Sequence, residues 1–387
     1  MERKLATIRK IADLRPIEGA DLIELAIIDG WQSVVKKGEF NVGDEIVYCE
    51  IDSWIPHTIA PFLSKGAVPK EYNGIPGAKL KTIKLRGQIS QGLILSVASC
   101  IEQSGCWIPL VEALVEGEDA SEWLNIQKWE PVATGMGETK GSFPDFIPKT
   151  DQERVQNITG YLIDDAIGFP HRIQYEVTTK LEGRSITIYY HNGSIGVCSR
   201  NQELVIDGNV AGSCYVKTAI DSKIFDALRK HCYNKQISPD YQDGEQPYCV
   251  NVAIQGELMG PGVEGNHEGL DRLKIFIYDV YNIDTMDYLL PQARRHFVEA
   301  LLQHCDQNII EHIPVLHNDF PLSSLCGEMP NRDIVLEKAF ELADGPSLRH
   351  TIREGVVLKQ TKWYDRGTKQ PLSWKIINNN YLLTVSK

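Results

Sequence analysis

The sequence predicts an α+β protein of two domains, a small β-barrel followed by a larger domain of strands and helices. Residues 1–125 contain many short apolar or alternating runs separated by glycines, a pattern typical of a small barrel. A segment rich in glycine and proline follows at 126–149 and is interpreted as a linker. Beyond it, residues 150–387 contain strand-like runs that each end in one charged residue, and a helical run at Pro291–Gln303. A chain of 387 residues is long enough for two hydrophobic cores.

The barrel strands are predicted from alternation and from the glycines that separate them. Because side chains alternate between the two faces of a strand, short runs of this kind have one face for a core. Five runs meet this criterion: Leu22–Ile28, Gln32–Val35, Glu45–Cys49, Lys81–Leu85 and Gly92–Val97.

A basic patch lies in this part of the chain, at Lys79, Lys81, Lys84 and Arg86. It is either an edge strand protected by charge or a surface that follows an RNA phosphate backbone. On one continuous strand, the first two side chains would point away from the last two. The aromatic residues Trp31, Tyr48 and Trp54 have two interpretations as well, base stacking or, for at least two of them, core packing.

Composition limits the possible partners. A net charge of −12 argues against electrostatic capture of nucleic acid over the whole surface, so a nucleic-acid footprint must be local. No apolar run is long enough for a membrane span, and the first residues lack the apolar segment of a secretory signal. Nine cysteines without zinc-type spacing indicate a reducing compartment, so we expect a cytoplasmic protein.

Lys180 lies in the string YEVTTKLEGRSITIYY, between two strand-like runs. A lysine amine at the end of a buried strand, with a carboxylate and a glycine close behind it, can attack the α-phosphate of a nucleotide once it is deprotonated. The tetrapeptide alone also fits an ordinary surface turn.

Further motifs follow this lysine in a fixed order: GVCSRNQEL, VNVAIQGELMGPGVEGN, LKIFIYDVYNI, REGVVLK and LSWKIINNNYLL. The ordered set resembles the motifs of the covalent nucleotidyltransferases over roughly Phe143 to the C-terminus. GELMGPGVEGN, and FPDFIPKTDQERVQN before the lysine, resemble the RNA ligase 2-like branch. The segment GADLIELAIIDGWQSVVKKGEFNVGDEIVYCEIDSWIP resembles OB-fold modules that bind nucleic acid. Related DNA ligases and capping enzymes carry such a module after the last lysine motif, whereas here it comes first.

The resemblance implies an OB-fold module at 1–125, a linker at 126–149 and a nucleotidyltransferase domain of ATP-grasp-like antiparallel sheets and helices at 150–387. It implies an ATP-dependent RNA ligase that seals RNA 3′-OH and 5′-phosphate ends through lysyl-AMP and RNA-adenylate intermediates. We expect ATP as the AMP donor, Mg²⁺ or Mn²⁺ as the metal, a nicked RNA duplex as the substrate and a monomeric protein.

The resemblance also implies a role for each site residue. Lys180 is the nucleophile, and we expect Lys375 and the metal to lower its pKa. Lys375 would also contact the α-phosphate, although the family's second lysine is absent, with Ile377 or Ser373 in its place. The carboxylates Glu182, Glu257 and Glu354 would bind the metal through water, with contact to the ribose hydroxyls as the alternative for Glu257. The remaining expected nucleotide contacts are Gly183, Arg200, Phe276 or Tyr278, Gly355 and Lys359, with Arg200 also facing RNA.

Two rival functions stay open at this point. One is guanylyl transfer in RNA capping on the same scaffold, which would use GTP. The other is a non-enzymatic RNA- or tRNA-binding protein that uses only the OB-fold module.

Overall fold

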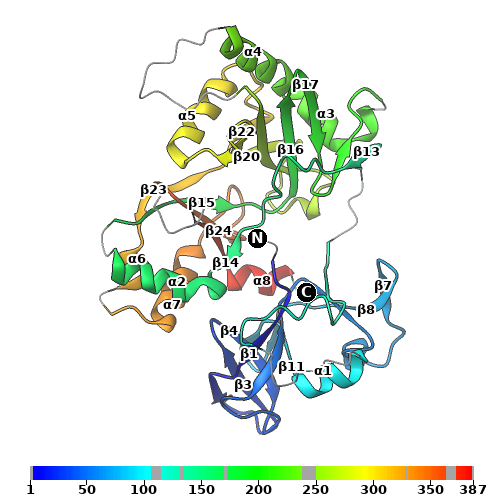
Figure 1. Cartoon of the computed structure of the whole chain (residues 1–387), viewed down its shortest axis with the longest axis vertical. Coiled ribbons are helices and arrows are strands. Elements are labelled where there is room, and N and C mark those ends of the chain that lie inside the picture. Colours follow the sequence, from blue (N-terminus) through cyan, green and yellow to red (C-terminus); the bar gives the residue numbers. More distant parts are fainter. Residues whose placement is uncertain are drawn as a thin grey trace.

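The computed structural model describes residues 3–105, 115–130, 135–169, 172–208, 210–237, 250–327, 329–362 and 372–385. Figure 1 shows the N-terminal barrel, in blue and cyan, at one end of the molecule. A five-stranded sheet lies in the middle and an eight-stranded sheet lies at the other end. The α+β fold predicted from the sequence is confirmed.

The N-terminal part consists of short antiparallel strands around two apolar clusters. Strand β5 (Glu45–Cys49) explains the arrangement, because its side chains alternate between the clusters. Ile46 and Tyr48 pack into one, and Val47 and Cys49 pack into the other. The other elements are β1 (Ala6–Lys10), β2 (Asp13–Pro16), β3 (Ile23–Ile28), β4 (Trp31–Lys36), β6 (Ser53–Pro56), β7 (Lys70–Tyr72), β8 (Ile75–Lys79), β9 (Ile83–Leu85), β10 (Gln88–Ser90), β11 (Leu93–Ser96), α1 (Val97–Ser104) and β12 (Gln127–Lys128).

Each of the five predicted barrel strands overlaps an observed strand. The basic patch differs from the expectation of one continuous strand. Strand β8 ends at Lys79, β9 begins at Ile83, and Arg86 has a left-handed backbone with φ of 47° in the turn to β10. The three aromatic residues Trp31, Tyr48 and Trp54 are all buried, which favours core packing over base stacking.

The central sheet has the strand order β14-β25-β24-β15-β23. Helices α2, α6 and α7 lie together against it (Figure 1) and bury Trp374, Tyr175 and Val356 in one apolar cluster. Its elements are β14 (Glu153–Arg154), α2 (Val155–Gly168), β15 (Gln174–Lys180), β23 (Val315–Pro321), α6 (Ser323–Cys326), α7 (Arg332–Ala343), β24 (Gly355–Gln360) and β25 (Ser373–Ile377). Helix α8 (Asn379–Val385) follows β25 directly.

The large sheet has the order β13-β18-β17-β16-β19-β20-β21, with β22 paired to β20. Helix α5 (Pro291–Leu302) matches the predicted helical run, and its Phe297, Val298 and Leu301 are buried as expected. The other elements are β13 (Thr139–Ser142), β16 (Arg184–His191), β17 (Ser194–Cys198), β18 (Gln202–Leu204), α3 (Cys214–Asp221), α4 (Ile224–Ile237), β19 (Val252–Met259), β20 (Lys274–Asn282), β21 (Asp287–Tyr288) and β22 (Ile310–His312).

The segment predicted as a linker contains short strands near both ends. Strand β12 pairs with β6 of the barrel, and β13 pairs with β18 of the large sheet. The predicted boundaries at 125 and 150 stay a prediction, because these strands attach parts of the segment to the bodies on either side.

Candidate active site

Lys180 is the last residue of β15, where the chain crosses from the central sheet to the large sheet. Residues 181–183 make the crossing, and β16 starts at Arg184. Strand β15 pairs with β24, which places Lys180 opposite Gly355. Its Nζ atom therefore lies 2.6 Å from Oε1 of Glu354.

A cavity of about 710 Å³ lies where the two sheets and the barrel meet. The expected key residues Lys180, Glu257, Glu354 and Lys375 all line it. Of the other expected residues, it is lined by Lys79, Glu182, Gly183, Arg200, Tyr278 and Lys359.

Three carboxylates surround the lysine. Burial raises the pKa of Glu257 to about 8, with Lys180 opposing the shift and Glu354 adding to it. Burial also raises the pKa of Glu182, whose carboxylate is hydrogen-bonded to Tyr381 and lies 3.1 Å from Nε2 of His267. A bound cation would offset the repulsion between these neighbouring carboxylates.

The pKa of Lys180 differs from the expectation. Burial alone would lower this pKa, but the carboxylates of Glu354, Glu257 and Glu182 outweigh burial and raise it above the usual value. In the protein alone Lys375 does not lower this pKa below its usual value, and the lowering by Lys375 together with the metal ion stays a prediction. Sequence reasoning considered the cation Lys375, whereas the fold places the acidic groups closer.

Lys375 lies on β25, and its Nζ atom is 3.0 Å from Oδ1 of Asp151. Burial lowers the pKa of Lys375 to about 8, and Asp151 opposes that shift. Ile377, two residues along the strand, lines the same cavity, so an apolar side chain stands where the family's second lysine was expected. Ser373 is absent from the cavity wall and its Oγ atom is buried without a hydrogen bond.

Arg200 and Lys359 line the cavity but are engaged in ion pairs. Arg200 Nε lies 2.6 Å from Oε1 of Glu130. Lys359 Nζ lies 2.6 Å from Oδ1 of Asp279 and donates a hydrogen bond to the carbonyl of Tyr278. Burial lowers the pKa of Lys359 to about 8. Any phosphate contact by either residue would compete with these partners.

The structure separates the two candidate stacking residues. Tyr278 lines the cavity, with its hydroxyl 3.0 Å from Oγ1 of Thr150. Phe276 is 1% exposed, packs with Leu181 and Met259, and does not itself line the cavity. Of these two rings, Tyr278 is therefore the one that the cavity exposes.

The glycines near the lysine leave room for neighbouring strands. A Cβ atom at Gly183 would lie 2.4 Å from the carbonyl oxygen of Leu258, and one at Gly355 would lie 2.0 Å from that of Ile376. Both positions therefore require glycine for the packing of the protein itself, whatever they contribute to a nucleotide site.

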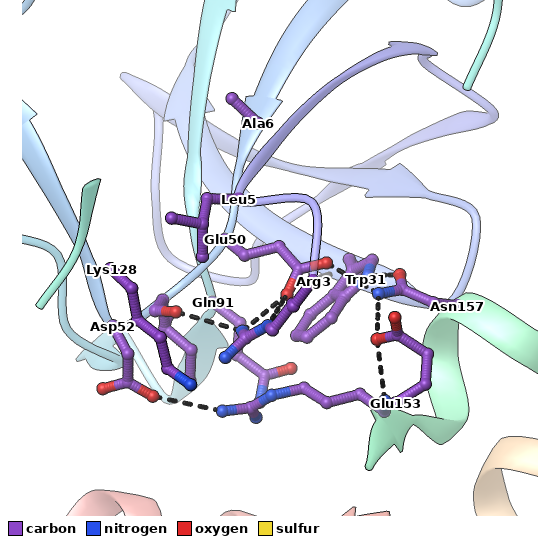
Figure 2. A network of polar contacts seen from close by, with 12 residues as sticks. Arg3, Leu5, Ala6, Trp31, Glu50, Asp52, Gln91, Lys128, Glu153 and Asn157 are labelled. Carbon is purple, nitrogen blue, oxygen red and sulfur yellow. Dashed lines mark hydrogen bonds and ion pairs between the residues drawn. The ribbon is translucent and has the colours of Figure 1, made fainter. Parts of the chain in front are cut away.

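The barrel adds residues to the cavity that sequence reasoning missed. Figure 2 shows Arg3 bonded to the buried carboxylate of Glu50, which also accepts a hydrogen bond from Asn157 of helix α2. Arg3, Asp52 and Lys128 line the cavity beside Arg154, which lies 3.3 Å from Asp52. The Nε and Nη1 atoms of Arg154 are buried without hydrogen-bond partners. These residues are far apart in the sequence, and sequence reasoning gave none of them an individual role.

Comparison with known proteins places this site in a family. A family model described as an OB-fold domain matches residues 5–97, and one described as RNA ligase matches residues 173–375. A mutant of Naegleria gruberi RNA ligase with AMP and Mn is 36% identical, with 98% of each chain covered and a TM-score of 0.77. The chain belongs to the RNA ligase family. The Naegleria gruberi RNA ligase with PPi is 37% identical over 98% of each chain, with a TM-score of 0.76. A search of curated proteins found no match.

The family assignment confirms the expected combination of an OB-fold domain and an RNA ligase domain. This RNA ligase therefore acts on RNA and is an enzyme, and the non-enzymatic alternative is not supported. Within the described ranges, no helix is long and apolar enough to cross a membrane.

The RNA ligase site also has features that fit a hydrated metal ion. Among the described residues, no three His, Cys, Asp or Glu side chains lie close enough together to hold a metal ion directly. The Oε2 atom of Glu354 is nevertheless buried without a hydrogen-bond partner. Carboxylates that are too far apart for direct ligation suit Mg²⁺ or Mn²⁺, which commonly keep several water ligands.

Proposed function

We propose that this RNA ligase seals RNA 3′-OH and 5′-phosphate ends with ATP, through lysyl-AMP and RNA-adenylate intermediates. The observation that carries the proposal is that Lys180, Glu257, Glu354 and Lys375, from four strands or strand ends, line one cavity. Naegleria gruberi RNA ligase structures with ATP, AMP, PPi and Mn support the choice of ATP and a divalent metal.

In the first step, Lys180 Nζ attacks the α-phosphorus of ATP. A nitrogen–phosphorus bond forms, and the bond to the pyrophosphate leaving group breaks. The ammonium must lose a proton first, and Oε1 of Glu354, at 2.6 Å, is positioned to accept it. Lys375 balances the negative charge that grows on the α-phosphate. AMP then passes to an RNA 5′-phosphate, and an RNA 3′-OH displaces it.

The carboxylates Glu182, Glu257 and Glu354 would hold the hydrated Mg²⁺ or Mn²⁺. When bound, the cation supplies positive charge that offsets the carboxylates and so favours the neutral form of Lys180. Tyr278 would stack on the base, and Arg200, Lys359 and the backbone at Gly183 would contact the nucleotide. The ion pairs of Arg200 and Lys359 then have to exchange for phosphate contacts.

We also propose an RNA-binding surface on the barrel. Lys81, Lys84 and Arg86 are exposed, and Lys79 connects them to the cavity, where it lies over the ring of Trp129. A local patch is compatible with the overall charge of −12 because exposed charges act mainly within about 10 Å at ordinary salt. We propose a nicked duplex as the substrate, a monomeric protein and a cytoplasmic location.

The test is covalent labelling. We expect wild-type protein incubated with α-labelled ATP and Mn²⁺ to keep the label on a denaturing gel, and Lys180→Ala to lose it. Lys223→Ala, at an exposed site in the turn between α3 and α4, is the matched control and should label normally. Label from GTP but not from ATP would favour capping, and the absence of label from both would remove the mechanism.

A further inference from the structure

We propose that Asp151 is a positioning residue that gathers three cations at the cleft and keeps the ammonium charge of Lys375. The inference rests on the proposed function of Lys375 as a phosphate contact. Asp151 lies just before β14, in a stretch for which sequence reasoning gave no individual role.

Three cations from three different sheets meet at this one carboxylate. Lys375 Nζ lies 3.0 Å from Oδ1, and Lys128 Nζ lies 2.6 Å from Oδ2. Arg200 Nη2 lies 3.4 Å from Oδ2. Lys375 belongs to the central sheet, Lys128 to a strand paired with the barrel, and Arg200 follows β17 of the large sheet. Asp151 therefore holds together three cations that lie on separate elements of the fold.

The local backbone accounts for the position of Asp151. Strand β14 pairs with β25 in parallel, with Arg154 opposite Lys375. This pairing brings the segment that precedes β14 alongside the strand that carries the lysine. The carboxylate is about one-fifth exposed and the lysine about one-eighth, at 22% and 12%, so solvent screens their attraction only in part.

Asp52 is a second carboxylate whose charge interacts with Lys375, but the largest effects around the lysine disfavour its charge. Burial is the largest effect that lowers its pKa, and Arg3, Arg154 and Lys180 add to the lowering. Asp151 opposes them. Burial alone would raise the pKa of Asp151, but Lys375, Lys128 and Arg200 hold it far below its ordinary value. The carboxylate therefore stays ionised at neutral pH and favours the charged lysine.

A carboxylate in a phosphate-binding cleft has a cost, because it repels the incoming phosphates. Without Asp151, the three cations Lys375, Lys128 and Arg200 would lose their shared carboxylate, and Lys375 would give up its proton nearer to neutral pH. Asp151 and the phosphates are then successive partners of the same lysine, one before the nucleotide arrives and the other after it.

The experiment measures single-turnover labelling by α-labelled ATP from pH 6 to pH 9, with Mn²⁺ in excess and ATP well below saturation, so that the rate reports the protein before the nucleotide binds. The variants are Asp151→Asn and, as a matched control, Asp145→Asn, which removes an exposed carboxylate six residues away. Loss of an opposite charge at this distance shifts a pKa by about one unit or more. We expect the rate of Asp151→Asn relative to wild type to fall about tenfold further at pH 9 than at pH 6. Asp145→Asn should keep a constant ratio.

A second variant keeps the test valid if Asp151→Asn misfolds. Its rate relative to wild type should change with pH in the opposite direction. Lys128→Gln removes a cation that competes for Asp151, so its rate relative to wild type should rise from pH 6 to pH 9. If thermal melting shows that Asp151→Asn does not fold, the rise in the relative rate of Lys128→Gln is the test of the inference. A pH-independent ratio in folded Asp151→Asn, or no rise in Lys128→Gln, overturns the inference. Absence of label in the wild type would instead contradict the proposed function.

Discussion

At the scale of single residues, the site holds carboxylates whose negative charges repel one another. Glu257 is half-buried beside two other carboxylates, and its pKa is raised to about 8. Between the ordinary value of 4.5 and about 8, the folded protein binds a proton that the unfolded chain releases. The free energy of unfolding therefore decreases as pH rises through this window. Such a cost is typical of active sites, where groups are placed for chemistry rather than for stability.

Replacing the Glu257 carboxylate should raise the stability of the protein and lower its activity. We predict that Glu257→Gln, without metal, has a free energy of unfolding about 4 kcal/mol higher than that of wild type at pH 8 in a urea titration, with little difference near pH 4.5. The same variant should lose most lysine labelling. Glu299→Gln, on the exposed face of α5, is the control for the loss of one charge. An unchanged or lower stability of Glu257→Gln at pH 8 would contradict this account.

At the scale of elements, strands deliver the functional groups to one cavity. The two aromatic residues on β20 show how closely related positions differ, because Tyr278 lines the cavity and Phe276 lies in the core. Strand β20 is irregular here, with a register shift in its pairing with β19 between Gln255 and Gly256. Sequence spacing could not distinguish the two residues.

This difference predicts opposite phenotypes. Tyr278→Leu should weaken ATP binding about tenfold, as expected for a lost stacking contact, and leave the unfolding midpoint nearly unchanged. Phe276→Leu should lower the free energy of unfolding by about 1 kcal/mol or more and leave ATP affinity nearly unchanged. Calorimetric titration with ATP in a Lys180→Met background gives the affinities, and urea titration gives the stabilities. Weaker ATP binding by Phe276→Leu alone would reverse the assignment.

The sequence was most informative where one strand carries its own motif. Lys180, Glu257, Glu354 and Lys375 were found because each lies in one motif of an ordered set, and the fold brings these motifs together. Arg3, Lys128 and Asp151 were not assigned, because their importance depends on contacts between distant segments and no local pattern marks them. The raised pKa of Lys180 was missed for the same reason.

At the scale of the whole molecule, the barrel is joined to the RNA ligase domain through buried polar contacts. Glu50, 1% exposed, accepts hydrogen bonds from Arg3 and Asn157, and Asn157 accepts one from Nε1 of Trp31 (Figure 2). Gly30 packs so closely on helix α2 that a Cβ atom there would lie 2.8 Å from Cα of Gln156. Buried polar groups that lose a partner are costly, so this interface should be specific.

We predict that Asn157→Ala lowers the free energy of unfolding by about 1–3 kcal/mol, because Glu50 and Trp31 each lose a buried partner. Lysine labelling should slow as well, since the interface positions Arg3 and Asp52 at the cavity. Urea unfolding and single-turnover labelling measure the two effects. Asn318→Ala, at an exposed position on β23, should change neither. Wild-type behaviour of Asn157→Ala would show that the interface contributes little.

The most direct measurement of the central claim is the location of the AMP group after reaction with ATP and Mn²⁺ and proteolysis. Mass spectrometry should find the added mass of AMP on the peptide that contains Lys180, on the lysine itself, and pyrophosphate should discharge it. A protein that seals RNA while AMP is found on another residue, or on none, would contradict the account.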